Sequence, residues 1–408
     1  MISIKNNSVL NKNIFFSFFQ YILSGLYPLI IILFISTRLS VETWGELTII
    51  QASSILVSLL IIFGTDSLGM RKIPKSGSNN IEIFNSIKQV YFIRLINFLV
   101  ISIFSYIFIK PYYGTIDTLA VLLWAFSIII SPLWAYIALD RTKQFINTEI
   151  FVRIASLVML YIFITEDSDK YLHIAIICSS NLIFSIITTI NLIRNFYVKD
   201  LCLKNIDLIK SGYRESLPFV SIQLLNHSYI MLPVLLVGSI LGSAEAANYG
   251  NAEKFQRLFR SSISPLGRVL LSYNSKKDID KSEIIKQWPY SALFGIILFF
   301  VGVIIATTFF DYFFSNDYKA MKTISIIMFA SLPFIFTSSH LINSFLYPEG
   351  KEVILRRMLV FIAPITILLL VYFMSIYGLV FTAIITLIAE IILSISIYSF
   401  MKYNLKHK

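Results

Sequence analysis

A polar stretch in the second half of this 408-residue chain carries the side chains whose types and spacing indicate chemistry. Residues 246–260 read Ala-Ala-Asn-Tyr-Gly-Asn-Ala-Glu-Lys-Phe-Gln-Arg-Leu-Phe-Arg and stand among long apolar segments. On a helix with about 100° per residue, one face carries Tyr249, Glu253, Gln256, Arg257 and Arg260. A charge near the centre of a bilayer costs roughly 2.5–3.5 kcal/mol on insertion scales. The stripe is therefore expected to face a wet cavity or charged partners.

The arginines of this face suit the binding of an anion. Glu253 and Arg257 are four residues apart and are predicted to pair, whereas Arg260 has no carboxylate three or four residues away. A guanidinium binds phosphate and carboxylate groups through two parallel hydrogen bonds. The pattern predicts a site for a phosphate or an acidic sugar, with Lys254 beside the stripe as a further ligand. The alternatives are an interfacial helix, or arginines that snorkel to the headgroups.

Other intramembrane polar residues extend the candidate site. Arg38, Arg94 and His227 are assigned to the same cavity. Arg94 stands near the cytoplasmic end of a span, so snorkelling is its alternative explanation. A lone histidine such as His227 is more often a hydrogen-bonded core residue than a proton carrier.

Two carboxylates are candidates for coupling transport to an ion. Glu390 stands in the middle of the last apolar segment and is either a protonatable group or a neutral, hydrogen-bonded core residue. Asp66 stands near the cytoplasmic end of the second segment, close enough in sequence to Arg71 for the two to form part of a gate.

The elements that position these residues are twelve apolar segments. A stretch of about 20 apolar residues is long enough to cross the hydrocarbon core as a helix. The predicted spans are 14–36, 44–68, 88–109, 116–139, 149–165, 171–193, 216–241, 246–270, 288–310, 319–346, 356–376 and 379–400. The span at 149–165 is marginal in length. Prolines that can kink these helices are Pro28, Pro132, Pro218, Pro233, Pro333 and Pro364.

Lysine and arginine are distributed unevenly between the two sides of these spans. Of the 34 basic residues, 25 fall on one side in loops or flanking turns, 5 fall on the other, and 4 lie deeper. Short cytoplasmic loops carry such an excess of positive charge. The pattern predicts that both termini are cytoplasmic and that loops 242–245 and 311–318 are periplasmic.

Composition excludes several classes of protein. A mean hydropathy of +0.77 with 14% charged residues excludes a soluble domain. The net charge of +11 is spread over the cytoplasmic loops, so topology explains it and no nucleic-acid partner is expected. The sequence has no Walker A motif, no HExxH, no paired His/Cys metal spacing and no GxSxG elbow. We expect neither an enzyme nor a metal or cofactor site, and Cys178 and Cys202 do not make a disulfide framework.

The two halves of the chain resemble each other at an offset of 205 residues. Pro28 falls on Pro233, Trp44-Gly45 on Tyr249-Gly250, Gln51 on Gln256, and Arg71-Lys72 on Lys276-Lys277. Because each half holds six spans, the copies have the same orientation, with a substrate site expected between them. The sequence predicts an all-α polytopic membrane protein with two parallel six-helix lobes around a central cavity. The lobes are 14–193 and 214–402, joined by a charged cytoplasmic linker at 194–213.

Short motifs resemble those of a known family. The matching residues are Arg38-Leu39-Ser40, Val41-Glu42-Thr43-Trp44-Gly45, Phe63-Gly64, Arg71-Lys72-Ile73, Ile240-Leu241-Gly242 and Asn248-Tyr249-Gly250-Asn251-Ala252-Glu253-Lys254. They resemble the helix junctions of the Wzx O-antigen flippases, which belong to the multidrug/oligosaccharidyl-lipid/polysaccharide exporter (MOP) superfamily. Ala247 stands near the place where that family has a glycine before the tyrosine.

The resemblance implies a flippase of the bacterial inner membrane. Its substrate would be an undecaprenyl-diphosphate-linked oligosaccharide of O antigen or capsule, moved from the cytoplasmic to the periplasmic leaflet by alternating access. Arg257 and Arg260 would hold the diphosphate or an acidic sugar, and Glu253 would hold the arginines. Energy would come from H⁺, another ion or the membrane potential, and the partners would include a polysaccharide polymerase and a chain-length regulator.

Two other functions stay open. A drug/cation antiporter of the same superfamily would be expected to place carboxylates in the cavity of its first lobe, whereas the deep charges here are mainly cationic. An O-antigen polymerase typically has a large periplasmic loop, whereas the external loops near 165–171 and 311–318 are short.

Overall fold

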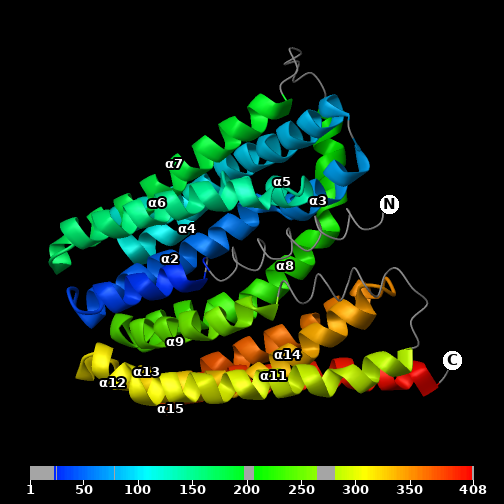
Figure 1. Ribbon diagram of the computed structural model, residues 1–408. Helices are drawn as coiled ribbons and strands as arrows, with labels where there is room; N and C mark the ends of the chain where they lie inside the picture. Colours follow the sequence, from blue (N-terminus) through cyan, green and yellow to red (C-terminus); the bar gives the residue numbers. More distant parts are fainter. Residues whose placement is uncertain (1–22, 24, 78, 197–205, 264–280, 407–408) are drawn as a thin grey trace. The chain divides into compact units, whose positions relative to one another are not determined.

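The computed structural model of the protein describes residues 23, 25–77, 79–196, 206–263 and 281–406. Within these ranges the regular secondary structure is entirely helical, as Figure 1 shows. After a helix at Gly25–Ile35, the elements are α2 (Val41–Ile62), α3 (Thr65–Lys75), α4 (Asn80–Ile129), α5 (Leu133–Ala138), α6 (Thr142–Phe163), η1 (Asp167–Asp169), α7 (Lys170–Phe196), α8 (Ile206–Ile240), α9 (Ser243–Ser261), α11 (Lys281–Thr308), α12 (Phe310–Phe313), η2 (Asn316–Tyr318), α13 (Lys319–Phe329), α14 (Leu332–Leu341), η3 (Ile342–Leu346) and α15 (Glu352–Lys406).

The helices follow the predicted spans. In the described part of the chain, seven helical stretches are long and apolar enough to cross a membrane, and α8 is an eighth if its two bent halves form one span. The predicted spans are mostly helical as far as the described residues reach, and most of the marginal span at 149–165 lies in the 22-residue α6. Within these residues, three of the spans are interrupted, at 63–64, 130–132 and 330–331. The polar α9 is not one of the seven stretches. Residues 264–270 of its predicted span lie outside the described residues.

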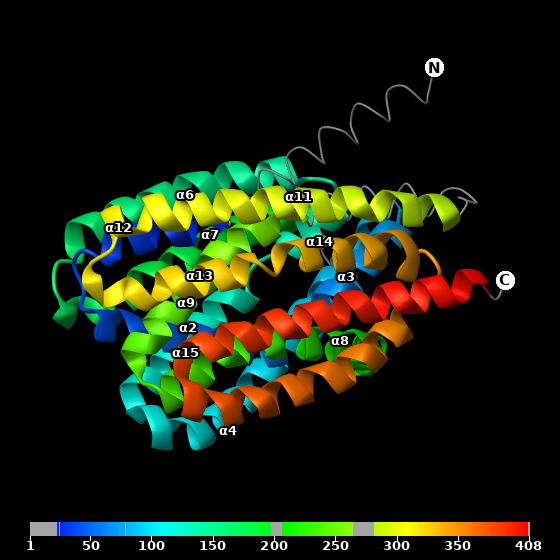
Figure 2. The same cartoon turned by 90° about the horizontal axis from the view of Figure 1, so that it is seen from below.

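Glycines separate consecutive spans in α4 and α15. Gly114 in α4 has φ 78° and Gly378 in α15 has φ 71°, and each marks the junction of two helices. Glycine adopts this left-handed backbone conformation without the steric cost that a side chain brings. Figure 2 shows that α15 reverses direction, because its orange half leads into a red half that runs back. The predicted separation between 356–376 and 379–400 therefore falls at the observed junction.

Contacts within the chain group the helices into two compact units. Among the described residues, unit 1 comprises Ile50–His227, and unit 2 comprises the residues up to Ile49 together with those from Ser228 onward. Both α2 and α8 therefore contribute to each unit. The predicted lobes, with their linker at 194–213, stay a prediction.

The core of unit 1 is an apolar cluster supplied by α3, α4, α5, α6 and α7. Its buried members include Ile73, Ile87, Trp134, Phe145 and Phe184. The rings of Phe145 and Phe184 meet edge to face with centroids 4.7 Å apart. Lipid tails are as apolar as these side chains, so close packing rather than exclusion from water holds such a cluster together in a bilayer.

In unit 2 the beginning of α2 packs closely on α9. Gly45 lies against the backbone of Ser243, and Gly250 lies against the side chain of Thr48. A Cβ atom on Gly45 would overlap the Ser243 carbonyl, so only glycine permits this approach. Gly45 and Gly250 are equivalent positions of the predicted repeat, and both lie at this contact.

The tenth predicted span, 319–346, is a broken helix in unit 2. α13 ends at Phe329 and α14 begins at Leu332, with Pro333 in its first turn. The chain then continues as the π-helical turn η3. Proline has no N–H and is tolerated in a first turn, where that donor has no partner within the helix. The break brings main-chain groups near the polar face of α9.

Candidate functional site

The helix α9 carries the polar stripe into the interior of unit 2. It packs against α13, and the ten residues Ala246–Phe255 are all buried. From Gln256 to Ser261 the helix is half buried. A helix that lies flat on a membrane keeps one face exposed to water along its length. The interfacial alternative for this stretch is therefore wrong.

Glu253 and Arg257 form the ion pair that their spacing predicts. Arg257 Nε donates to Glu253 Oε1 at 2.9 Å, and Arg257 Nη2 contacts Glu253 Oε2. The Glu253 side chain is 8% exposed, whereas that of Arg257 is 40% exposed. Contact at both oxygens fixes the plane of the guanidinium and compensates the buried carboxylate.

Arg260 pairs with Glu390 of α15. Arg260 Nη1 lies 3.4 Å from Glu390 Oε1, and the side chains are 27% and 6% exposed, respectively. Glu390 and Arg260 stand on different helices and are far apart in the sequence, yet their side chains meet. Sequence reasoning treated them separately, as an anion ligand and a coupling group. The only signal for the pairing was that two opposite charges within the membrane each needed compensation.

Gln256 attaches α9 to the break between α13 and α14. Its Nε2 donates to the main-chain oxygen of Met328 at 2.9 Å and to Ser331 Oγ at 2.7 Å. These bonds fix the turn of α9 that also carries Arg257 and Arg260. Gln256 therefore positions the arginine-bearing turn as well as lining the site.

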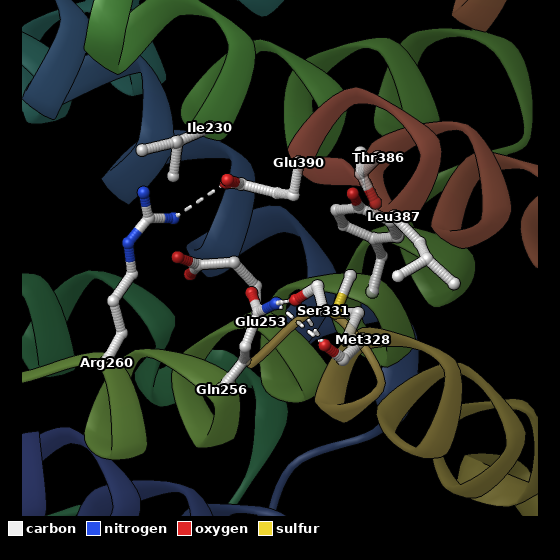
Figure 3. Close-up of a pocket in the computed structure, with 10 residues that line it drawn as sticks. Ile230, Glu253, Gln256, Arg260, Met328, Ser331, Thr386, Leu387 and Glu390 are labelled. Carbon is white, nitrogen blue, oxygen red and sulfur yellow. Dashed lines mark hydrogen bonds and ion pairs between the residues drawn. The ribbon is translucent and has the colours of Figure 1, made fainter. Parts of the chain in front are cut away.

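These residues surround a pocket of about 390 Å³, a volume that includes its open mouth. Its lining consists of Ile230, Tyr249, Glu253, Gln256, Arg260, Met328, Ser331, Thr386, Leu387 and Glu390. Figure 3 shows Arg260 and Glu390 reaching toward each other across the pocket, with the carboxylate of Glu253, from the same helix as Arg260, beside them. The stripe thus faces a polar pocket within unit 2, and its charges also have partners there.

Lys254 is not among the residues that line this pocket. The side chain is buried, and its Nζ lies 4.7 Å from the ring centre of Trp44. The same indole donates from Nε1 to Asn251 Oδ1 at 2.8 Å. A desolvated ammonium over an indole is stabilised by about 2 kcal/mol or more. Lys254 thus belongs to the contact between α2 and α9, although the sequence suggested a substrate ligand.

Arg94 is buried in unit 1 and is bonded on several sides. It is 2% exposed, so snorkelling is wrong for this residue. Its Nε donates to Thr65 Oγ1 at 3.0 Å, its Nη1 to the main-chain oxygen of Ile129 at 2.7 Å, and its Nη2 pairs with Asp66. Asp66 thus has Arg94 as a partner, where the sequence suggested Arg71. This network ties α3 to two separate parts of α4, at Arg94 and at Ile129.

The remaining two candidates are placed only in part. Arg38 lies in the turn before α2, with its guanidinium carbon 4.5 Å from the ring centre of Phe34. His227 lies in α8, but its side chain is outside the described part of the structure. The structure therefore brings together Tyr249, Glu253, Gln256 and Arg260 with Glu390, with Arg257 paired to Glu253 beside them. Lys254 and Arg94 have their partners at other places.

The charged groups at the pocket balance each other. One guanidinium and two carboxylates line it together with hydroxyl groups and an amide, and Arg257 stands next to it on α9. A guanidinium in such a pocket can bind an anion through two parallel hydrogen bonds. Among the described residues, no group of three or more His, Cys, Asp or Glu side chains could hold a metal ion.

The chain is similar in sequence to proteins of polysaccharide export. Residues 10–276 match the family model described as "Polysaccharide biosynthesis protein". A Shigella dysenteriae protein named "Putative O-antigen transporter" is 23% identical over 394 residues, which cover 92% of this chain and 97% of that protein. An Escherichia coli K12 protein of the same name is 20% identical over 252 residues, which cover 60% of each chain.

Solved structures confirm the predicted fold class. A multidrug resistance MATE family transporter of the MOP superfamily, in an inward-facing conformation, matches with a TM-score of 0.66 and 13% identity over 94% of both chains. A mutant of a Vibrio cholerae MATE transporter matches with a TM-score of 0.61 and 15% identity, covering 98% of this chain and 97% of that one. The chain is an all-α polytopic membrane protein of this fold.

Proposed function

Because the chain belongs to the polysaccharide biosynthesis protein family and is a membrane transporter, we propose that it flips undecaprenyl-diphosphate-linked oligosaccharides across the bacterial inner membrane. The repeat units would be those of O antigen or capsule. The sequence relatives support a glycan substrate, whereas the fold is also that of multidrug transporters. The observation that carries the proposal is the pocket at Arg260, because its guanidinium, hydroxyl and amide groups can bind a lipid-linked diphosphate.

Each polar group near the pocket has a role in this proposal. Arg260 binds the diphosphate from within the pocket, and Arg257 binds it or an acidic sugar from the neighbouring turn. Glu253 fixes Arg257 through both oxygens. The lipid tail stays in the bilayer, so only the headgroup needs to enter. The cavity between the two lobes opens first to the cytoplasm and then to the periplasm, and this change carries the headgroup across the membrane.

An ion gradient or the membrane potential drives this cycle in our proposal. Each charge that crosses the membrane is worth about 2.3 kcal/mol per 100 mV. Glu390 and Asp66 are the candidate coupling groups, and each carboxylate pairs with an arginine whose charge it balances. Contacts with a polysaccharide polymerase and a chain-length regulator complete the proposed pathway, with both termini of the chain in the cytoplasm.

Deletion of the gene tests the proposed function. The expected result is accumulation of lipid-linked repeat units on the cytoplasmic leaflet and loss of long surface polysaccharide. Accessibility of the glycan to an impermeant lectin in spheroplasts reports the leaflet, and the chain restored on a plasmid is the control. Repeat units that still reach the outer leaflet but remain unpolymerised would favour the polymerase alternative and overturn the proposal.

A further inference from the structure

We propose that Glu390 is an exchange ligand for Arg260. The Glu390 carboxylate pairs with the Arg260 guanidinium when no substrate is bound. This ion pair opens when a diphosphate binds Arg260 and forms again when the diphosphate leaves. The inference rests on the proposed function, because it concerns the same pocket and the same class of anion. It assigns Glu390 to substrate release, in addition to any part in coupling.

The geometry distinguishes the two arginines of α9. Arg257 and Glu253 are on one helix, and both carboxylate oxygens contact the guanidinium. Arg260 meets Glu390 across two helices, with 3.4 Å between Nη1 and Oε1. Charge-assisted hydrogen bonds are shorter, at about 2.7–2.9 Å. The Arg260 pair is therefore the one that an incoming anion can open at the lower cost.

The burial of the pair favours exchange in place. The carboxylate side chain is 6% exposed and the guanidinium side chain is 27% exposed, so an anion in the pocket can reach Arg260 from its open side. A diphosphate carries more negative charge than one carboxylate and can engage the guanidinium through two parallel hydrogen bonds. After exchange, the hydroxyl groups of Ser331 and Thr386 remain in the same pocket as Glu390. Hydroxyl donors reduce the cost of a buried carboxylate.

Competition of this kind prevents binding that is too tight for transport. A ligand that binds only the open form of a site has its apparent affinity reduced by the fraction of molecules in that form. If the Arg260–Glu390 pair is closed in about nine molecules out of ten, the diphosphate binds roughly tenfold more weakly than to a site without Glu390. Re-formation of the pair likewise speeds departure of the anion on the far side.

The test measures binding of two probes, inorganic pyrophosphate and farnesyl diphosphate, to the purified full chain in detergent. Glu390→Gln keeps the shape of the side chain and removes its charge. It is expected to bind both probes roughly tenfold more tightly than the natural chain, yet to export less surface polysaccharide in cells. Glu390→Asp, which retains the charge on a shorter side chain, should give an intermediate gain in affinity and partial export. A purely structural role for Glu390 would lower stability without any gain in affinity.

The chain offers a matched control in unit 1. Glu149 and Arg153 of α6 also form an ion pair, with side chains 3% and 24% exposed, close to the values for Glu390 and Arg260. Glu149→Gln should leave probe affinity unchanged, and an equal gain in that variant would overturn the proposal. If Glu390→Gln does not yield folded protein, the affinity of Glu390→Asp decides in its place.

The outcomes separate the inference from the function on which it rests. Arg260→Ala should lose most of the affinity for both probes. If it does, and the Glu390 variants bind no more tightly than the natural chain, the exchange is wrong while the anion site stands. If Arg260→Ala binds both probes normally, the site itself is wrong. Tighter binding by Glu390→Gln together with normal export would refute the role in release.

Discussion

Replacement of Arg260 by alanine should abolish most of the export while lowering stability by a predictable amount. In the proposed function, export falls because the pocket loses the guanidinium that would bind the diphosphate. Stability falls because Glu390, whose side chain is 6% exposed, loses this partner. Removal of one member of a fully buried ion pair costs about 3–5 kcal/mol. Arg260 is 27% exposed and the pair is long, so we expect about 1–2 kcal/mol after allowance for solvent.

A second substitution separates the two effects. In the double variant Arg260→Ala/Glu390→Gln, neither charge remains, so the thermal unfolding midpoint in detergent should return toward that of the natural chain. Export should not return, because the anion ligand is still missing. Arg260→Lys should retain part of the export, since it keeps the charge but loses the bidentate geometry. Arg257→Ala should be milder than Arg260→Ala, because Glu253 already occupies Arg257.

The assays are the length distribution of surface polysaccharide in a deletion strain, normalised to protein level in the membrane, and the unfolding midpoint of each purified variant. A well-expressed Arg260→Ala protein that supports normal long polysaccharide would remove Arg260 from the site. A double variant that is no more stable than Arg260→Ala alone would show that the ion pair does not contribute to stability.

Three further predictions concern the rest of the molecule. Gly45→Ala should lower the thermal midpoint more than Gly250→Ala, because its Cβ meets backbone of α9 rather than a side chain that can rotate; overpacking costs about 1–3 kcal/mol, and equal effects would contradict this reasoning. Arg94→Met should cost about 1–3 kcal/mol and reduce protein level, because it leaves the Ile129 carbonyl without this donor and the half-buried Asp66 without this partner; an unchanged midpoint would argue against this role. A single cysteine at Ser315, in a chain without other cysteines, should react with an impermeant maleimide in cells whose inner membrane is intact, and reaction only after that membrane is broken would reverse the topology.

Local features of the molecule were predictable from the sequence because local spacing determines them. The apolar runs locate the helices, and the spacing of four residues gives the pair Glu253–Arg257. Pro333 marks the break in the tenth span, because proline is tolerated in the first turn of the second helix but not in the interior of a continuous one. One glycine in α4 and one in α15 mark the points where the chain turns back between two spans. The apolar runs on either side are separated by only a few residues, and glycine allows so tight a turn.

Partners on different helices were not predictable in the same way. The pairs Arg260–Glu390 and Arg94–Asp66, and the contact between Lys254 and Trp44, depend on which helices pack together and in what register. No periodicity within one helix contains that information. The cost of charge in a membrane nevertheless predicts that such residues find partners, and each of these cations has one. The assignment of Lys254 and Arg94 to a substrate cavity overlooked this explanation.

The balance of charge at the pocket bears on how the proposed cycle is driven. When no anion is bound, Arg257 and Arg260 are matched by Glu253 and Glu390, so these four side chains add no net charge to the moving part. A membrane potential then exerts little force on them during return of the empty protein. Negative charge enters only with the diphosphate, and a potential that is negative inside favours its outward movement by about 2.3 kcal/mol per charge at 100 mV. Pairing with carboxylates thus lowers the free-energy cost of placing the arginines in the membrane. It also means that, in the proposed cycle, the membrane potential acts mainly on the step in which the protein carries the diphosphate outward.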